Sequence, residues 1–419
     1  MSGHHGGPDG HHDGSDWDDA RRIAYDAGAR LRERLPPAEE LGLGSAAGRV
    51  LARDVRALHA LPHYASSAMD GWAVAGAGPW RVRPTAGPRH DAGEPLAPGW
   101  AAPIVTGGAL PEGTTAVLRS ERGRIEGAGP GGTAGTGGSA GGLLAATEDV
   151  PVGADIRPAA TEAVEGSLLL RAGSVLTPAA VAVAALAGHD GVPVAARPSV
   201  RLVMTGGEVE THGLPAPGRV RDAFGPVLPS CLAALGAGGL ESLRIGDDAT
   251  ATRRAISGGG DVVVTTGGTG RSEADHVRRA ALDEGAVLLV DQVAMRPGHP
   301  ALLARFPDGR LLAALPGNPL AALAAVATLL EPLLRAAGGR PASYPLPVRS
   351  AAAWAPLPRR HRLVPARWTD GPGSALEAAD HTGPAMMRGL AAADAFLVLP
   401  PEGVPDGGTA RCVPLPWMP

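Results

Sequence analysis

The segment from Asp261 to Asp275, DVVVTTGGTGRSEAD, constrains the fold more than any other part of the chain. It joins a run of valines, which is typical of a buried strand, to three glycines and then to acidic residues that suit the start of a helix. A strand that turns through glycines into a helix is a common ligand site in α/β sheets, because the backbone is accessible and the helix offers unpaired N–H groups. The segment matches neither GxGxxG nor GxxxxGK[ST], so a purely structural turn is an equally good interpretation.

Strand-like and helix-like segments alternate around this turn. Strands are expected at residues 200–204, 240–245, 262–266, 287–290 and 311–315, and helices at 226–235, 249–257, 273–283 and 319–336. This alternation predicts a mostly parallel, doubly wound sheet with helices on both faces. Polar residues that follow the parallel strands are then expected to line one crevice.

The length of 419 residues indicates several domains, because one hydrophobic core rarely serves a chain of this size. The sequence predicts a flexible tail at 1–16, a discontinuous α+β domain at 17–60 and 145–197, an inserted small β domain at 61–144, the α/β domain at 198–339, and a β-barrel-like domain at 340–419. The glycine-rich loop at 123–142 is expected to carry no chemistry. The four histidines of the tail allow weak metal binding as an alternative to plain flexibility.

Composition and charge exclude several classes of partner. All 38 basic residues are Arg, they are mixed with 42 acidic residues, and the net charge is −4, so no general attraction to nucleic acid or an anionic membrane is expected. Cys231 and Cys412 lie far apart without metal-ligand spacing. Prolines interrupt the longest apolar run, 311–330, and the N-terminus lacks an apolar signal stretch, so we expect a soluble cytoplasmic protein.

Four polar groups follow strands of the expected α/β domain. They are Glu208, the pair Asp247 and Asp248, the glycine turn that leads to Asp275, and Pro316-Gly317-Asn318-Pro319. Carboxylates that converge on one crevice repel each other unless a cation lies between them, and Mg²⁺ is the natural candidate because it takes oxygen ligands and bridges to phosphate. Taken singly, each acid is more often a helix N-cap or a solvated loop carboxylate.

Two further segments have two possible interpretations. In LPHYASSAMDGWAV, Ser66, Ser67 and Asp70 crowd a turn before a strand, which is either a plain polar turn or part of a site. In MRPGHP, Arg296 and His299 either bind an oxyanion or form a solvated pair in a tight loop.

Six motifs in order resemble those of the MoeA family and of the equivalent domain of gephyrin, from about Trp17 onward. They are SSAMDGWAV, IVTGGALPEGTTAV, TGGEVETHG with GRVRD, TTGGTGRSEAD, MRPGHP and LPGNPLAA. The resemblance implies a four-part, L-shaped protomer that forms a homodimer, with the cleft between the α/β domain of one subunit and the inserted domain of the other. It also implies insertion of molybdenum from molybdate into adenylylated molybdopterin, with release of AMP and assistance by Mg²⁺.

The resemblance assigns roles to residues of this sequence. The catalytic residues it implies are Asp70, Thr106, Glu208, Asp247 and Asp275, of which Glu208, Asp247 and Asp275 are also the implied metal ligands. The implied cofactor-binding residues are Gly267, Gly268, Thr269, Gly270, Ser272, Arg296, Pro297, Gly298, Pro316, Gly317, Asn318, Pro319 and Arg362. A metal held by carboxylates would stabilise the developing phosphate charge, and the glycine turn would hold the pterin phosphate.

The chain departs from the family pattern mainly at basic and acidic positions. The family's TGDEL reads TGGEV here, the two lysines of KPGKP are Arg296 and His299, and an expected Gly-Ser is Gly383-Pro384. Arg keeps the charge but binds a tetrahedral anion differently from Lys. Two alternative functions stay open: a molybdopterin adenylyltransferase, because the TGGTG turn is closer to that of the stand-alone adenylyltransferases, and a non-catalytic pterin-binding paralogue, because basic positions are altered. A molybdopterin adenylyltransferase and molybdoenzyme chaperones are further candidate partners.

Overall fold

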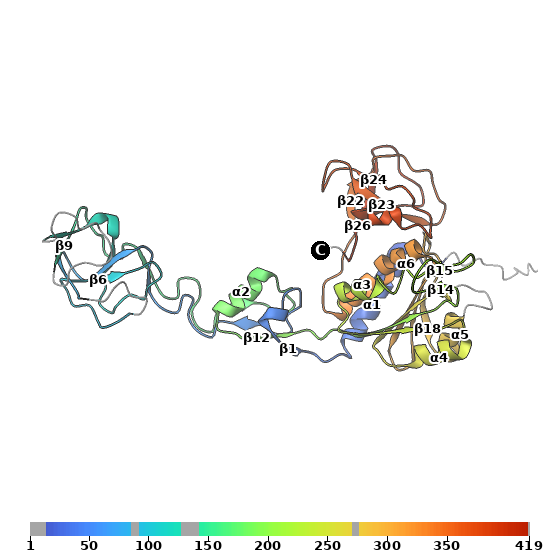
Figure 1. The fold of residues 1–419 in the computed structure, drawn as a ribbon, viewed down its shortest axis with the longest axis horizontal. Helices are drawn as coiled ribbons and strands as arrows, with labels where there is room; N and C mark the ends of the chain where they lie inside the picture. The colour runs from blue at the N-terminus through green and yellow to red at the C-terminus, as the bar shows by residue number, and fades with distance from the viewer. Residues whose placement is uncertain (1–13, 85–91, 127–141, 270–275, 418–419) are drawn as a thin grey trace, which may run out of the picture. The chain divides into compact units, whose positions relative to one another are not determined.

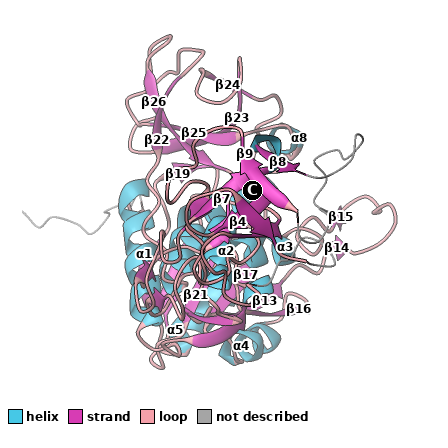
Figure 2. Cartoon of the chain, turned by 90° about the vertical axis from the view of Figure 1, so that its left-hand side faces the viewer, coloured by secondary structure: helices cyan, strands magenta, loops and turns pink. Residues whose placement is uncertain are grey.

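The computed structural model describes residues 14–84, 92–126, 142–269 and 276–417. The chain forms two compact units, which are coloured along the sequence in Figure 1 and by secondary structure in Figure 2. We call Met1–Glu39 together with Val194–Pro419 the main unit, and Glu40–Pro193 the inserted unit.

The main unit contains a six-stranded sheet of order β16-β13-β17-β21-β20-β18. Its strands are β13 (Ser199–Met204), β16 (Gly239–Arg244), β17 (Val262–Thr266), β18 (Val287–Asp291), β20 (Leu302–Arg305) and β21 (Leu311–Leu315). Strands β16, β13, β17 and β21 are parallel and in register, so their carboxyl ends meet at one edge. The mostly parallel sheet is confirmed, and β20, which is antiparallel to both neighbours, is an element that the sequence did not predict.

Helices cover both faces of this sheet. On one face lie α1 (Trp17–Arg32), α3 (Leu228–Leu235), α6 (Pro319–Ala325), the π-helical turn η3 (Val326–Leu330) and α7 (Glu331–Ala337), and on the other α4 (Ala249–Ser257) and α5 (His276–Asp283). The side chains of β17 alternate between the faces, with Val262 and Val264 in one core and Val263 in the other. The sheet is therefore doubly wound, because every central strand is apolar on both sides.

Helix α1 belongs to the main unit, although the sequence placed residues 17–60 in the discontinuous domain. Trp17 is fully buried and its indole Nε1 donates to Thr328 Oγ1 over 3.0 Å. Arg21 forms a buried ion pair with Glu331 over 3.1 Å. Local sequence predicts this helix but not its partner, since its apolar face needs a surface that only the folded sheet unit supplies.

Among the described residues, one helical stretch, Pro319–Ala337, is long and apolar enough to cross a membrane, but it is almost wholly buried inside the unit. It packs as the central core helix, with Leu320, Leu323, Leu329 and Leu333 nearly inaccessible. Burial of this kind is typical of the core helix of a large domain.

A second six-stranded sheet of the main unit contains the C-terminal residues. Its strands are β19 (Met295–Arg296), β22 (Leu346–Arg349), β23 (His361–Trp368), β24 (Leu376–Ala378), β25 (Ala395–Leu399) and β26 (Thr409–Pro414), and the short helix α8 (Arg388–Ala391) accompanies them. The two residues of β19 come from the α/β segment and pair in parallel with β23, Met295 with His361 and Arg296 with Arg362. This pairing brings a loop of the α/β segment against the C-terminal strands.

In the residues that the structure describes, the inserted unit contains short strands and one apolar helix. Its sheet of order β7-β4-β6-β5-β9-β8 comprises β4 (Gly71–Val74), β5 (Trp80–Val82), β6 (Trp100–Ile104), β7 (Ala116–Arg119), β8 (Gly123–Glu126) and β9 (Leu143–Ala146). Three ladders pair β1 (Glu39–Gly42) with β12 (Gly191–Val194), β2 (Val55–Arg56) with β11 (Leu168–Leu170), and β3 (Ser66–Ser67) with β10 (Ile156–Arg157). Helix α2 spans Pro178–Leu186, and single 3₁₀ turns occupy Leu43–Ser45 and Ser120–Arg122.

Candidate functional site

The loops that follow β13, β16, β17 and β21 lie side by side at the carboxyl edge of the main sheet. Gly267 N donates to Leu315 O over 2.8 Å, which joins the end of β17 to the end of β21. A Cβ placed on Gly317 would lie 3.8 Å from Gly267 Cα, so the two turns are in contact. This arrangement unites the glycine turn and Pro316–Pro319, as expected for the edge of a parallel sheet.

The glycine turn after β17 requires glycine at its first two positions. Gly267 and Gly268 have φ angles of +81° and +65°, in the left-handed region. A Cβ on Gly267 would lie 2.8 Å from Thr205 Oγ1, and one on Gly268 would lie 2.8 Å from Val277 Cγ2 of α5. The bare backbone is therefore packed between β13 and α5, and Thr269, which follows, is buried.

The carboxylates of Glu208 and Asp247 lie over two adjacent glycines. Gly207 N donates to Asp247 Oδ2 over 2.7 Å. A Cβ on Gly207 would lie 3.2 Å from the same oxygen, and one on Gly206 would lie 3.2 and 3.3 Å from the two oxygens of Glu208. Asp248 instead caps α4 by accepting from Ala251 N over 2.6 Å. The structure thus places Asp247 against the turn that contains Glu208 and gives Asp248 a structural role.

Within the described residues, no group of three or more His, Cys, Asp or Glu side chains is placed to hold a metal ion. Asp275, the third predicted ligand, lies outside the described residues, as do Gly270 and Ser272 of the glycine turn. Mg²⁺ commonly takes one or two carboxylates and completes its shell with water and substrate phosphate. The two neighbouring carboxylates fit that donor set, and the metal site stays a prediction.

Arg296 and Arg362 form a pair of like charges on neighbouring strands. They are directly paired in the parallel register of β19 and β23. Adjacent like charges on a sheet are unfavourable unless an anion lies near both, so this pair suits an oxyanion. His299, which the sequence grouped with Arg296, is fixed by a 2.7 Å hydrogen bond between its Nδ1 and Val293 O within its own loop.

The arginine pair is connected to the start of α6. A Cβ on Gly298 would lie 3.2 Å from Ala321 O, so the Arg296–Gly298 loop packs closely against that helix. The N–H groups of Leu320 and Ala321 both donate to Pro384 O, over 3.0 and 3.2 Å. These two donors are therefore engaged, and an anion at this turn has to be held by the residues before Leu320 and by the arginines.

In the inserted unit, Asp70 and Thr106 come together although 36 positions separate them. The carboxylate Oδ1 of Asp70 accepts from Thr106 N over 2.7 Å and from Thr106 Oγ1 over 2.9 Å. The backbone hydrogen bond first, and the hydroxyl hydrogen bond second, lower the pKa of Asp70. Hydrogen bonds from Gly107 N to Ser67 O and from Ser67 N to Gly108 O hold both turns in place. The result is an exposed, ionised carboxylate in a fixed position.

We expect Thr106→Val to raise the pKa of Asp70, because the variant loses the hydroxyl donor and keeps the backbone N–H. The wild-type pKa is depressed, so the stabilising contribution is present above the ordinary carboxyl pKa and is lost as pH falls through the depressed pKa. In Thr106→Val this stabilising contribution is lost at a higher pH than in the wild type. A ¹³C carboxyl titration by NMR measures the shift, and Thr106→Ser, which keeps the hydroxyl, should leave the pKa unchanged. Equal pKa values in Thr106→Val and wild type would contradict this account.

Models of three known domains match most of the chain. The MoeA N-terminal region (domain I and II) matches residues 16–188, a probable molybdopterin binding domain matches 201–336, and the MoeA C-terminal region (domain IV) matches 347–409. The molybdopterin molybdenumtransferase of Synechococcus elongatus is 33% identical over 322 residues, which cover 72% of this chain and 76% of the relative. The chain belongs to the MoeA family.

Two other comparisons agree with membership of the MoeA family. The molybdopterin molybdenumtransferase 2 of Mycobacterium tuberculosis is 29% identical over 395 residues, which cover 86% of this chain and 91% of the relative. The crystal structure of the molybdopterin biosynthesis MoeA protein from Pyrococcus horikoshii OT3 has a TM-score of 0.71 at 20% identity and covers 95% of this chain and 99% of that chain. The likeness of the two structures shows a shared fold.

One charged contact of this MoeA family member was missed from the sequence. Arg244, at the carboxyl end of β16, donates to the Asp222 carboxylate and lies 3.4 Å from Met204 Sδ. Asp222 also accepts from the N–H groups of Phe224 and Gly225, over 3.0 and 3.1 Å. Arg244 lies at a strand end, two residues before Gly246-Asp247-Asp248. This position could have identified Arg244 from the sequence, because side chains at strand ends face the crevice. Arg244 orders the loop beside Glu208.

Proposed function

We propose that this chain transfers molybdenum from molybdate to adenylylated molybdopterin and releases AMP, the last step in forming the molybdenum cofactor. The observation that carries the proposal is the placement of three features along one sheet edge: two carboxylates beside the Gly206-Gly207 turn, a glycine turn and a pair of arginines. The reaction needs a cation near a phosphate, a backbone-lined anion site and a binding place for molybdate. The names of the curated relatives agree with this choice of reaction.

The glycine turn is proposed to hold the pterin phosphate. The N–H of Gly267 is engaged with Leu315 O, so Gly267 would shape the turn, while Gly268 and Thr269, with Gly270 and Ser272 beyond them, would present backbone N–H groups to the phosphate oxygens. Pro316, Gly317, Asn318 and Pro319 are in contact with this turn and are proposed to form the neighbouring wall. Backbone donors keep their position during the reaction, so they stabilise developing charge without rearrangement.

Mg²⁺ is proposed to be held by Glu208, Asp247 and Asp275. The placement of both carboxylates beside the Gly206-Gly207 turn supports this, because carboxylates on one turn favour a shared cation if they approach each other when the ion binds. When bound, the ion would neutralise charge on the phosphate that becomes AMP. Asp247 keeps Gly207 in place through its Oδ2 and has its other oxygen for the cation.

Molybdate is proposed to lie between Arg296 and Arg362, with Pro297 and Gly298 shaping the loop around it. A dianion between the two guanidiniums offsets their mutual repulsion. The molybdate oxygens are already anionic, so no general base is needed to activate them.

A homodimer is proposed to complete the site, with Asp70 and Thr106 of one subunit facing the main unit of its partner. Helix α2 supports self-association, because its sequence PAAVAVAAL is apolar all round while Ala184 is its one buried residue. Leu186, Val164 and Leu58 of the same unit are 65%, 61% and 56% exposed. A helix that is apolar on all sides is normally covered. We also propose a cytoplasmic location, the domain boundaries given from the sequence with α1 moved to the main unit, and transient contacts with a molybdopterin adenylyltransferase and molybdoenzyme chaperones.

The deciding experiment measures AMP released from adenylylated molybdopterin in the presence of molybdate and Mg²⁺. Release that depends on molybdate supports the proposed function. Formation of adenylylated pterin from molybdopterin and ATP would favour the adenylyltransferase instead. Pterin binding without release at saturating molybdate would favour a non-catalytic paralogue. Asp275→Ala is expected to abolish release while leaving the dimer folded.

We expect Arg296→Ala to raise the KM for molybdate by about 10- to 100-fold with a smaller change in kcat, because a charge-assisted hydrogen bond to the anion is lost. Steady-state AMP release over a range of molybdate concentrations measures this. Arg367→Ala, an exposed arginine on the same strand as Arg362, is the matched control and should leave the KM unchanged. An unchanged KM in Arg296→Ala would remove molybdate from this place.

A further inference from the structure

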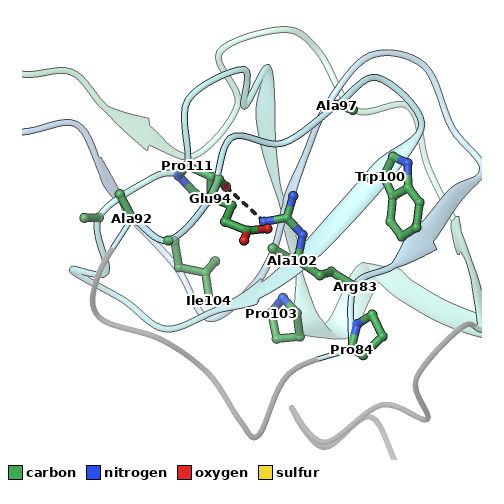
Figure 3. A pocket seen from close by; sticks show the side chains of 12 residues that line it. Arg83, Pro84, Ala92, Glu94, Ala97, Trp100, Ala102, Pro103, Ile104 and Pro111 are labelled. Carbon is green, nitrogen blue, oxygen red and sulfur yellow. Dashed lines mark hydrogen bonds between the residues drawn. The ribbon is translucent and has the colours of Figure 1, made fainter.

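The inserted unit contains a pocket of about 510 Å³ that none of the proposed roles uses (Figure 3). Its floor is one face of β6, where Trp100, Ala102 and Ile104 alternate with residues of the opposite face. Ala102 is the small residue between two large ones, so the strand leaves a hollow there. The segment from Glu94 to Ala97 lines the opposite side.

Arg83 supplies a flat, fixed wall to this pocket. Its Nη1 donates to Glu94 O over 2.9 Å, and its Nη2 donates to Pro95 O over 2.6 Å. Two backbone acceptors hold the guanidinium in one plane, and in the view of Figure 3 it lies between Trp100 and Glu94. A guanidinium fixed in this way is suited to stacking on a ring by its face.

The chemistry of the walls indicates the class of ligand. Trp100 and Arg83 offer two surfaces on which a planar ring stacks, and the Glu94 carboxylate is an acceptor for ring or amino N–H groups. A simple anion is disfavoured because Glu94 repels it and the terminal nitrogens of Arg83 already donate to carbonyls. An aliphatic chain would offer no donor to the Glu94 carboxylate and no ring face to the Arg83 guanidinium. We infer that this pocket binds a flat, amino-substituted nitrogen heterocycle.

The pocket borders the Asp70–Thr106 contact. Ile104 and Ala109, which both line it, stand on either side of the turn that contains Thr106. A ring bound here would therefore lie against β6, the strand that leads into the turn of Thr106. The choice of ligand rests on the proposed function. The substrate of that reaction, adenylylated molybdopterin, carries an adenine at one end and a pterin at the other. Both rings belong to the inferred class.

Calorimetric titration of the full-length chain with AMP, adenosine and 6-hydroxymethylpterin tests the inference. We expect at least one of these probes to bind. Binding of AMP or adenosine would indicate that the pocket takes the adenine end of the substrate, and binding of the pterin would indicate that it takes the pterin end. Ala102→Leu fills the hollow and should weaken binding at least about tenfold. Ala145→Leu, on β9 and outside the pocket, is the matched control and should bind as wild type does.

A second variant keeps the inference testable if Ala102→Leu does not fold. Glu94→Gln alters an exposed carboxylate on the pocket wall and should weaken binding about tenfold through loss of a charged acceptor. The inference is overturned if no probe binds the wild type at millimolar concentration, or if Ala102→Leu and Glu94→Gln both bind as wild type does. Binding without AMP release would instead refute the proposed function and leave this inference standing, because the titration requires no turnover.

Discussion

Asp70→Ala is expected to lower the rate of AMP release by about 10²- to 10⁴-fold, the usual loss when a positioned charged group is removed from an active site. The two hydrogen bonds from Thr106 hold the Asp70 carboxylate ionised and fixed, although it lies at the surface of the inserted unit. The Asp70 carboxylate is fixed by these hydrogen bonds and has no charged partner in its own turn. Its charge is therefore available to act on a ligand. AMP release at saturating molybdate, measured for both proteins, gives the ratio.

Two further variants separate charge from structure. Asp70→Asn keeps an oxygen acceptor for Thr106 and removes only the charge, so it should lose nearly as much activity as Asp70→Ala. Asp54→Ala is the matched control, because Asp54 is also a surface aspartate that accepts a backbone N–H, from Ala172 over 2.9 Å. Sedimentation should show the same assembly for all of these proteins. Wild-type rates in both Asp70 variants would exclude Asp70 from the reaction.

Arg21→Met is expected to reduce the free energy of unfolding of the main unit by about 3 kcal/mol, at the low end for a broken buried pair, because the Glu331 carboxylate loses its nearest cation but keeps Ser343 Oγ and Arg335. The side chains of Arg21 and Glu331 are only 7% and 8% exposed. Burial lowers the pKa of Arg21, while Glu331 opposes that effect. Hydrogen exchange of the α1 and α7 amides, with chemical unfolding of the whole chain, measures the loss in this unit.

The controls for this prediction use the same helix. Arg22→Met removes an exposed pair with Asp19, whose side chains are 63% and 58% exposed, and should change stability by less than about 1 kcal/mol. Combining Arg21→Met with Glu331→Leu removes both buried charges and should recover much of the loss. If Arg21→Met were no more destabilising than Arg22→Met, the buried pair would not be what joins α1 to α7.

The α/β sheet and part of the site could be read from the sequence because their signals are local. Valine runs, glycine turns and helix caps fix the strand ends, and parallel strands then bring Glu208, Asp247 and the glycine turn to one edge. Asp248 shows the limit of this reasoning, since its sequence pattern equals that of Asp247 while its carboxylate caps α4. Which of two adjacent acids faces the crevice depends on the path of the loop.

The other contacts join residues that are distant in sequence. Asp70 with Thr106, Arg296 with Arg362, and Pro384 O with the start of α6 each depend on how strands from different segments pair or pack. No local preference encodes such pairs, because the energy that selects them is the burial of whole apolar faces.

By itself, therefore, the sequence determined the alternation of elements, the parallel sheet and the edge at which its polar residues gather, since each follows from periodicity within a short segment. Only the tertiary structure decided that α1 packs in the main unit, that two arginines become neighbours, and that Ala102 leaves a pocket beside Trp100. Those features arise from side chains that meet only after the strands and helices have packed together.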